Sequence, residues 1–313
     1  YISSNFFDLH NGWANKKQSI QSANVKKILS DVKKKGDKAV IGYEKKFSNI
    51  RSRSTKIKFS KKEIINIIKK LDKNLKKSID IAFLRIKQFH VKQKFSSFRY
   101  KDKFKNELSY KYSPIERVGV YVPGGTASYP STVLMNCIPA IVAGVKNIIA
   151  CSPPKEGVDA HPTIVYTADL CGADVIMNLG GVPAIAAMTN GLFKNAPADI
   201  IVGPGNQFVA EAKRILFGKV GIDLFAGPTE IGIIADAKAD PEIVAVDLVG
   251  QAEHGYNSPC WLYTTSKELA EKVMKRVPEL IAELPEIPRT SAEAAWRDYG
   301  AGILCDTDRQ SDV

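Results

Sequence analysis

Two side chains with metal-binding chemistry, Gln251 and His254, lie three residues apart in the motif QAEHG. Apolar periodicity behind an Asp-Pro pair predicts a helix over 241–253, which places both side chains on one face at its last turn. Gly255 is expected to end this helix in a left-handed conformation. Imidazole suits zinc, and an amide oxygen is an uncommon but workable ligand. The spacing alone favours a simpler interpretation, a capped helix whose histidine interacts with the helix dipole.

A metal site built on this pair needs ligands from distant segments. The chain has three other histidines: His10, His90 and His161. Its five cysteines, an odd count without a CxxC pair, are Cys137, Cys151, Cys171, Cys260 and Cys305. They are typical of reduced cytosolic thiols rather than a disulfide framework or a thiolate zinc site, which predicts a cytoplasmic protein.

Three glycine turns follow predicted strands, at 123–125, 180–181 and 203–206. Glycine lets a backbone approach a ligand closely, and the N–H groups of a following helix favour an anion. None of the turns has the GxGxxG spacing of an ordinary dinucleotide site. Any one of them alone is best interpreted as a tight turn that binds nothing. Three on one sheet edge predict a nucleotide or substrate cleft.

The loop from Asp223 to Glu230 joins two alternating strand–helix sets. Its Thr229 hydroxyl and Glu230 carboxylate, beside a Gly-Pro turn, could contact a small polar substrate. They could equally belong to an interdomain turn, and periodicity does not decide between these alternatives.

The elements that must position these residues divide the chain in two. The first ~95 residues show helical periodicity with lysine-rich faces, including a capping-box pattern at Ser60 and Glu63. Residues 96–116 are expected to form a short polar hairpin or linker. From Val118, short apolar strands alternate with helices, which predicts parallel βα units and an open, doubly wound sheet. A second alternating set follows Thr229, with a second capping-box pattern at Thr265 and Glu268.

Composition narrows the function classes. The chain has 313 residues, 44% of them apolar and 25% charged, as in a soluble globular protein. No apolar run approaches the ~20 residues of a membrane-spanning helix. The net charge of +12 is concentrated in residues 1–116, while the remainder is net negative. We interpret the lysines as solvated helix faces and expect neither a nucleic-acid nor a membrane partner. The chain starts at Tyr1 rather than Met and stops abruptly at Val313, which suggests a fragment of a longer protein.

Three segments together resemble the histidinol dehydrogenase family. They are 118–145 (VGVYVPGGTASYPSTVLMNCIPAIVAGV), 199–216 (DIIVGPGNQFVAEAKRIL) and 222–255 (IDLFAGPTEIGIIADAKADPEIVAVDLVGQAEHG). The resemblance implies a homodimer that oxidises an amino alcohol to a carboxylate with NAD and zinc. It also implies two related doubly wound parallel-sheet domains, one inserted in the other. The corresponding divisions here are an N-terminal arm at 1–23, a discontinuous first αβ domain at 24–119 and 229–313, and an inserted domain at 120–228.

The resemblance also assigns roles to particular residues. Tyr121 and Asn206 match the family's NAD contacts, and a third NAD contact, a Gln in the family, falls at Pro183. Proline has neither an amide side chain nor a backbone N–H. The substrate contacts are implied at Thr229, Gln251 and His254, and the last two also match zinc ligands. The family's other zinc ligands, an Asp and a His, and its catalytic Glu-His pair fall beyond Val313, so no catalytic residue is assigned in this chain.

These assignments predict oxidation of L-histidinol through a bound aldehyde to L-histidine. Two alternatives stay open. The segments YNSPCWLYTTS (256–266) and AWRDYGAGILCDTD (295–308) look more like the branch of the family that acts on 2,3-dihydroxypropane-1-sulfonate (sulfopropanediol). The chain could also be a fragment that folds but does not turn over.

Overall fold

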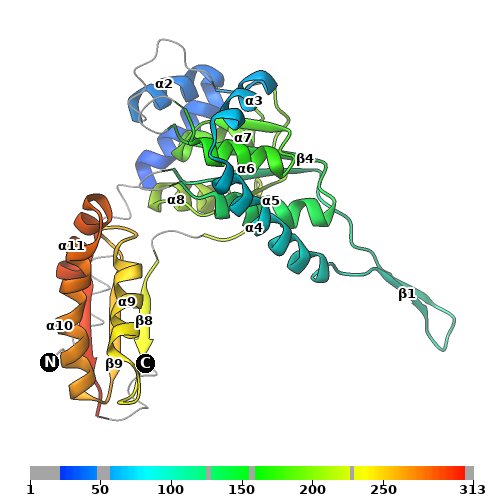
Figure 1. The fold of residues 1–313 in the computed structure, drawn as a ribbon. Coiled ribbons are helices and arrows are strands. Elements are labelled where there is room, and N and C mark those ends of the chain that lie inside the picture. Colours follow the sequence, from blue (N-terminus) through cyan, green and yellow to red (C-terminus); the bar gives the residue numbers. More distant parts are fainter. Residues whose placement is uncertain (1–21, 48–56, 125–127, 155–158, 226–228, 307–313) are drawn as a thin grey trace. The chain divides into compact units, whose positions relative to one another are not determined.

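A computed structural model describes residues 22–47, 57–124, 128–154, 159–225 and 229–306. Contacts divide these residues into two compact units, one ending at 225 and one beginning at 229. Each unit is described by itself (Figure 1).

The larger unit contains a five-stranded sheet in which every neighbouring pair is parallel. Its strands are β3 (Arg117–Tyr121), β4 (Asn147–Ser152), β5 (Val175–Asn178), β6 (Ile200–Val202) and β7 (Gly221–Ile222). The order is β5-β4-β3-β6-β7, so the chain moves outward from β3 in one direction and then returns to its other side. The doubly wound parallel sheet predicted from the sequence is confirmed.

Both faces of this sheet are covered by helices. These are α5 (Pro130–Ala143), α6 (Pro162–Leu170), α7 (Gly181–Asn190) and α8 (Gln207–Leu216). Side chains alternate along β3, so Val120 joins the apolar cluster with Leu134 of α5, and Tyr121 joins the opposite cluster with Ile185 of α7. The core therefore consists of two layers separated by the sheet, which explains the continuous apolar runs of its strands.

The lysine-rich N-terminal region packs on the same unit. Residues 22–35 are helical, and the helices that follow are α2 (Asp37–Phe47), α3 (Lys61–Lys70) and α4 (Lys73–Lys92). α2 contacts α7, α3 contacts α6, and α4 contacts α5. Contacts of the described residues thus group 24–119 with the inserted domain, whereas the sequence-based division joined them to 229–313. That joint domain stays a prediction.

Local capping sets the ends of these helices. The Ser60–Glu63 capping box is present, with the Ser60 N–H donating to the Glu63 carboxylate at 2.8 Å. The apolar period that continues past Leu71 belongs to two helices, because Asp72 accepts from the N–H groups of Asn74 and Leu75 and starts α4 afresh.

The predicted hairpin or linker at 96–116 is a hairpin of β1 (Phe98–Lys101) and β2 (Glu107–Tyr110), paired antiparallel. Figure 1 shows it extending away from the helices of the larger unit.

The smaller unit is a three-stranded parallel sheet of order β10-β9-β8. The strands are β8 (Ile231–Ile234), β9 (Cys260–Thr264) and β10 (Gly300–Leu304), and the helices are α9 (Pro241–Ala252), α10 (Lys267–Glu283) and α11 (Glu286–Tyr299). The expected cap of α10 at Thr265 is wrong by one residue, because Ser266 is the N-cap and its Oγ accepts from the Leu269 N–H.

Within the described residues, no helix is both long and apolar enough to cross a membrane. All five cysteines are buried and free of disulfide bonds.

Candidate functional site

The strand order of the larger sheet places a topological switch point between β3 and β6. Ligands of open α/β sheets bind in the crevice at the carboxyl ends of the strands, where the winding direction reverses. Tyr121 ends β3, and the turn from Gly203 to Asn206 follows β6. The fold therefore places at one edge of the sheet two of the residues to which the family resemblance assigned NAD contacts.

Tyr121 is almost completely buried beside this switch point. Its hydroxyl accepts a hydrogen bond from the Gly181 N–H at the start of α7, at 3.1 Å. Burial raises the pKa of Tyr121 to about 12, so the hydroxyl keeps its proton at neutral pH. Tyr121 can therefore offer a hydrogen-bond donor at the edge of the sheet, but not a general base.

The Gly203 turn has a conformation that only glycine fits. Gly203 has φ +110°, and a Cβ atom built on it would lie 2.0 Å from the carbonyl oxygen of Tyr121. Asn206 then caps α8, because its Oδ1 accepts from the N–H groups of Phe208 and Val209 at 3.1 Å each. Capping occupies Oδ1 and leaves the Nδ2 group as the donor that Asn206 can offer to a ligand.

Three side chains that the sequence analysis did not single out support these turns. The buried carboxylate of Glu44 accepts from the Gly180 N–H at 2.9 Å. Lys213 and Asp223 hold both backbone groups of Gly203. The sequence gives only weak signals for them. Glu44 and Lys213 are charged residues at apolar positions of their helices, and Asp223 comes directly after a short strand.

Pro183 lies buried in the first turn of α7. The first N–H groups of a helix have no partner within it, so the missing N–H of proline costs the helix no internal hydrogen bond here. Pro183 is thus structurally well placed, although it cannot make the amide contact that the family resemblance implies.

In the smaller unit, α9 brings Gln251 and Thr229 together. The Nε2 group of Gln251 donates to the backbone oxygen of Thr229 at 2.9 Å, which leaves the amide oxygen of Gln251 for another partner. His254 is exposed and follows the helix, which ends at Ala252. The predicted left-handed stop at Gly255 is wrong, because the φ angle of Gly255 is not positive. The chain instead continues into a turn in which the Ser258 N–H donates to the Gly255 oxygen.

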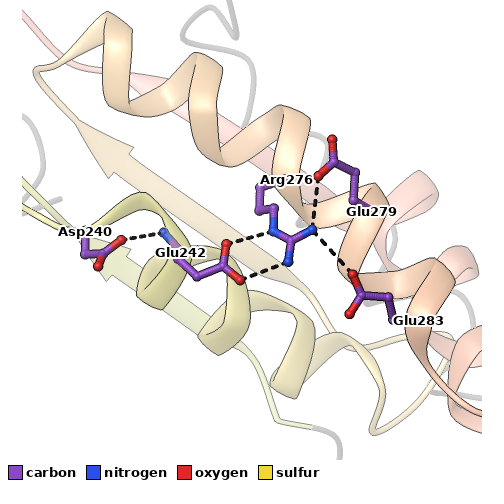
Figure 2. Close-up of polar contacts among 5 residues, drawn as sticks. All are labelled: Asp240, Glu242, Arg276, Glu279 and Glu283. Atoms are coloured by element: carbon purple, nitrogen blue, oxygen red, sulfur yellow. Dashed lines mark hydrogen bonds and ion pairs between the residues drawn. The ribbon is translucent and has the colours of Figure 1, made fainter.

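An ion-pair cluster fixes the other end of α9 (Figure 2). Asp240 caps the helix by accepting from the Glu242 N–H. Arg276 of α10 donates to both carboxylate oxygens of Glu242, at 2.7 and 3.0 Å, and also pairs with Glu279 and Glu283. A bidentate Arg–carboxylate pair has fixed geometry, so the cluster holds α9 in register with α10.

No three His, Cys, Asp or Glu side chains gather into a metal-binding group anywhere in the described part of the chain. Gln251 and His254 are therefore two candidate ligands, and a metal ion would need further ligands besides them. Tyr121 and Asn206 belong to the larger unit, and Thr229, Gln251 and His254 to the smaller one.

The larger unit is a doubly wound α/β sheet, and comparisons with known proteins identify the family of the chain. The sequence model of the histidinol dehydrogenase family matches residues 13–311. The chain belongs to the histidinol dehydrogenase family, whose members are oxidoreductases.

Three proteins illustrate the similarity. A histidinol dehydrogenase homolog of Pelagibacter ubique is 65% identical over 91% of this chain and 67% of its own length. A sulfopropanediol 3-dehydrogenase of Ruegeria pomeroyi is 47% identical over 90% of this chain and 64% of its own length. The crystal structure of histidinol dehydrogenase from Elizabethkingia anophelis superposes with a TM-score of 0.82 at 39% identity, covering 92% of this chain and 66% of that chain. This chain thus spans about two thirds of the length of these relatives.

Proposed function

We propose that this chain is part of a zinc-dependent NAD dehydrogenase that oxidises L-histidinol, through a bound aldehyde, to L-histidine in the cytoplasm. The observation that carries the proposal is the switch point of the larger sheet, where Tyr121 ends β3 and the Gly203–Asn206 turn follows β6, in a member of the histidinol dehydrogenase family. Its residues divide into a cofactor half-site and a substrate half-site.

The cofactor half-site is the switch point of the larger sheet. The Gly203 turn brings a backbone and the amino end of α8 to the sheet edge, where N–H groups and the helix dipole favour an anion such as a pyrophosphate. Asn206 offers its Nδ2 donor, and Tyr121 its hydroxyl. A bound NAD would supply the hydride acceptor, and these residues would orient it.

The substrate half-site is the carboxyl end of α9. The donor set, an exposed imidazole and an uncommon but workable amide oxygen, would supply two of the four ligands of a zinc site. A bound zinc would polarise the alcohol and hold its polar groups. Thr229, tied to Gln251, would place a hydroxyl beside that substrate.

One observation favours a second candidate substrate. The 47% identity to a sulfopropanediol 3-dehydrogenase covers 90% of this chain. Both candidates are primary alcohols that become carboxylates, so the same half-sites serve either one. The two candidates differ at the other end of the molecule, which is an imidazole in L-histidinol and a sulfonate in sulfopropanediol.

The deciding experiment measures NADH formation by the protein containing this chain, with NAD⁺ and zinc, against L-histidinol and sulfopropanediol. We expect turnover of L-histidinol, and a His254→Ala variant that loses it. Turnover of sulfopropanediol alone would make it, rather than L-histidinol, the substrate. NADH formation that survives His254→Ala unchanged would refute the substrate half-site. If residues 1–313 alone are inactive while a longer protein is active, this chain is a noncatalytic fragment of the enzyme.

We further propose that the protein is a homodimer and that the hairpin contributes to its interface. Phe98 pairs with Tyr110, and Tyr100 with Leu108, so these four side chains share one face of the ribbon, and all are exposed. The Arg99–Glu107 ion pair lies on the other face. A two-stranded hairpin is only marginally stable by itself, and contiguous apolar surface marks an interaction site.

A second copy of this chain is the occupant to which we commit, because the resemblance to the histidinol dehydrogenase family implies a homodimer and an apolar face can pack against its own copy in a second protomer. Light scattering coupled to gel filtration should show a dimer for the wild type and a monomer for Phe98→Lys/Tyr110→Lys. Arg99→Ala, on the other face, should remain dimeric. A wild-type monomer, or a double variant that still dimerises, would exclude this interface.

A further inference from the structure

An ion pair with one fully buried member, Lys213, binds the Gly203 turn. Lys213 of α8 has no exposed surface, and its Nζ contacts the Asp223 carboxylate at 2.5 Å. Asp223 follows β7 directly and is partly exposed. A fully buried lysine is rare unless it is paired, so this pair needs an explanation.

Both members of the pair bind the same glycine. Lys213 donates to the Gly203 oxygen at 2.8 Å, and the Gly203 N–H donates to the other oxygen of Asp223, also at 2.8 Å. The peptide groups on both sides of the left-handed residue are thus held by one charged pair. The turn cannot rotate away from Tyr121 without breaking charge-assisted hydrogen bonds, which are the stronger kind.

The pair also connects three elements around the switch point. Lys213 lies in the second turn of α8, about two turns after the N-cap Asn206. Asp223 directly follows β7, an edge strand of the sheet. The Lys213–Asp223 pair therefore fixes the start of α8, and with it the Nδ2 donor of Asn206, relative to the carboxyl end of β3.

We propose that Lys213 and Asp223 are positioning residues for NAD binding, which act through the Gly203–Asn206 turn rather than by touching the reacting atoms. This inference rests on the proposed cofactor half-site. The pair pre-organises the turn, so that the dinucleotide does not have to order it on binding.

The test is the dissociation constant of NAD⁺ for the protein containing this chain, measured by calorimetry at a temperature where each variant is fully folded by circular dichroism. The variants are Lys213→Met, Asp223→Asn and their combination. We expect each single change to weaken NAD⁺ binding by roughly tenfold to a hundredfold, the size of effect that small misplacements produce. Because the two residues act as one unit, the double variant should lose much less than the product of the two single losses.

The matched control is Arg214→Met. Arg214 is the next residue of α8 and pairs with Glu211 on the exposed side of the helix, without contact to the turn. It should bind NAD⁺ like the wild type. Because binding is measured only on folded protein, a merely structural role would leave all dissociation constants unchanged.

The outcomes separate the two claims. If the wild type binds NAD⁺ and both single variants bind it equally well, the positioning role is wrong and the cofactor half-site stands. If the wild type does not bind NAD⁺, the half-site and the positioning role both fail. If Lys213→Met does not fold, Asp223→Asn, which keeps the size of the side chain, decides the question.

Discussion

Replacing Gly203 by alanine tests how tightly the switch-point turn is packed. Gly203 has φ +110°, and its Cβ would lie 2.0 Å from the oxygen and 3.0 Å from the carbonyl carbon of Tyr121. Both atoms belong to the backbone of a central strand, so they cannot move aside as a flexible side chain would. The new methyl group must therefore either push β3 and β6 apart or force the turn into another conformation.

The expected loss of stability has two parts, which a control variant separates. A non-glycine residue at positive φ costs about 1–2 kcal/mol, and forcing an extra carbon into a packed site costs about 1–3 kcal/mol more. Gly218 has φ +89° but nothing within 4 Å of its Cβ position, so Gly218→Ala carries only the first part. We expect losses of ~2–5 kcal/mol for Gly203→Ala and ~1–2 kcal/mol for Gly218→Ala.

The assay is urea unfolding followed by far-UV circular dichroism, with NAD⁺ binding measured on the folded variants. Gly203→Ala should also weaken NAD⁺ binding, whereas Gly218→Ala should not. Equal losses of stability in the two variants would show that the turn relaxes freely away from Tyr121. That result would refute the reasoning that the backbone contact at β3 constrains the site.

Three further predictions concern the other parts of the site. His254→Ala should weaken zinc binding by roughly tenfold or more in a chelator competition, whereas His90→Ala should leave it unchanged. Pro183→Gln should lower the KM for NAD⁺ about threefold to tenfold, the value of one added hydrogen bond, and an unchanged KM would mean that no contact is made there. Arg276 holds the pKa of Glu242 below its ordinary 4.5, so their pairing stabilises the fold fully above about pH 4.5 and is lost as pH falls through the lowered pKa. Arg276→Met should therefore reduce stability at pH 7 but leave it nearly unchanged at the acid end of a denaturation series.

Patterns of local origin were predictable from the sequence. The alternation of short apolar strands and helices after Val118 predicted a parallel doubly wound sheet, because two-sided burial gives strands a continuous apolar run. The capping box at Ser60 was predictable because both partners lie within four residues. The metal-type pair at Gln251 and His254 was likewise visible as a spacing, although the geometry of the helix end at Gly255 was not.

The supports of the turns were not predictable, because their partners are distant in the chain. Glu44 contacts Gly180 across 136 residues, and Asp223 contacts Gly203 across 20. A charged residue in the apolar pattern of α8, such as Lys213, is the one hint that the sequence offers. It shows that a charge is buried, but not with what. Relative placement of segments, which no local pattern encodes, decides which backbone groups such a charge holds.

The two sheets show why strand order rather than glycine turns locates the cofactor half-site. β3-β4-β5 and β8-β9-β10 wind in the same way, each strand adding to the same side of the one before. Only the larger sheet, among the described residues, then returns to the other side of its first strand, with β6. The helix that follows β3, α5, packs on one face of the sheet, and the helix that follows β6, α8, packs on the other. No single connection therefore covers the carboxyl ends of both β3 and β6. In the smaller sheet the carboxyl ends of β8 and β9 lead into α9 and α10. The Gly203 turn therefore lies at an open edge, whereas glycines of the smaller sheet, such as Gly302, lie within a strand.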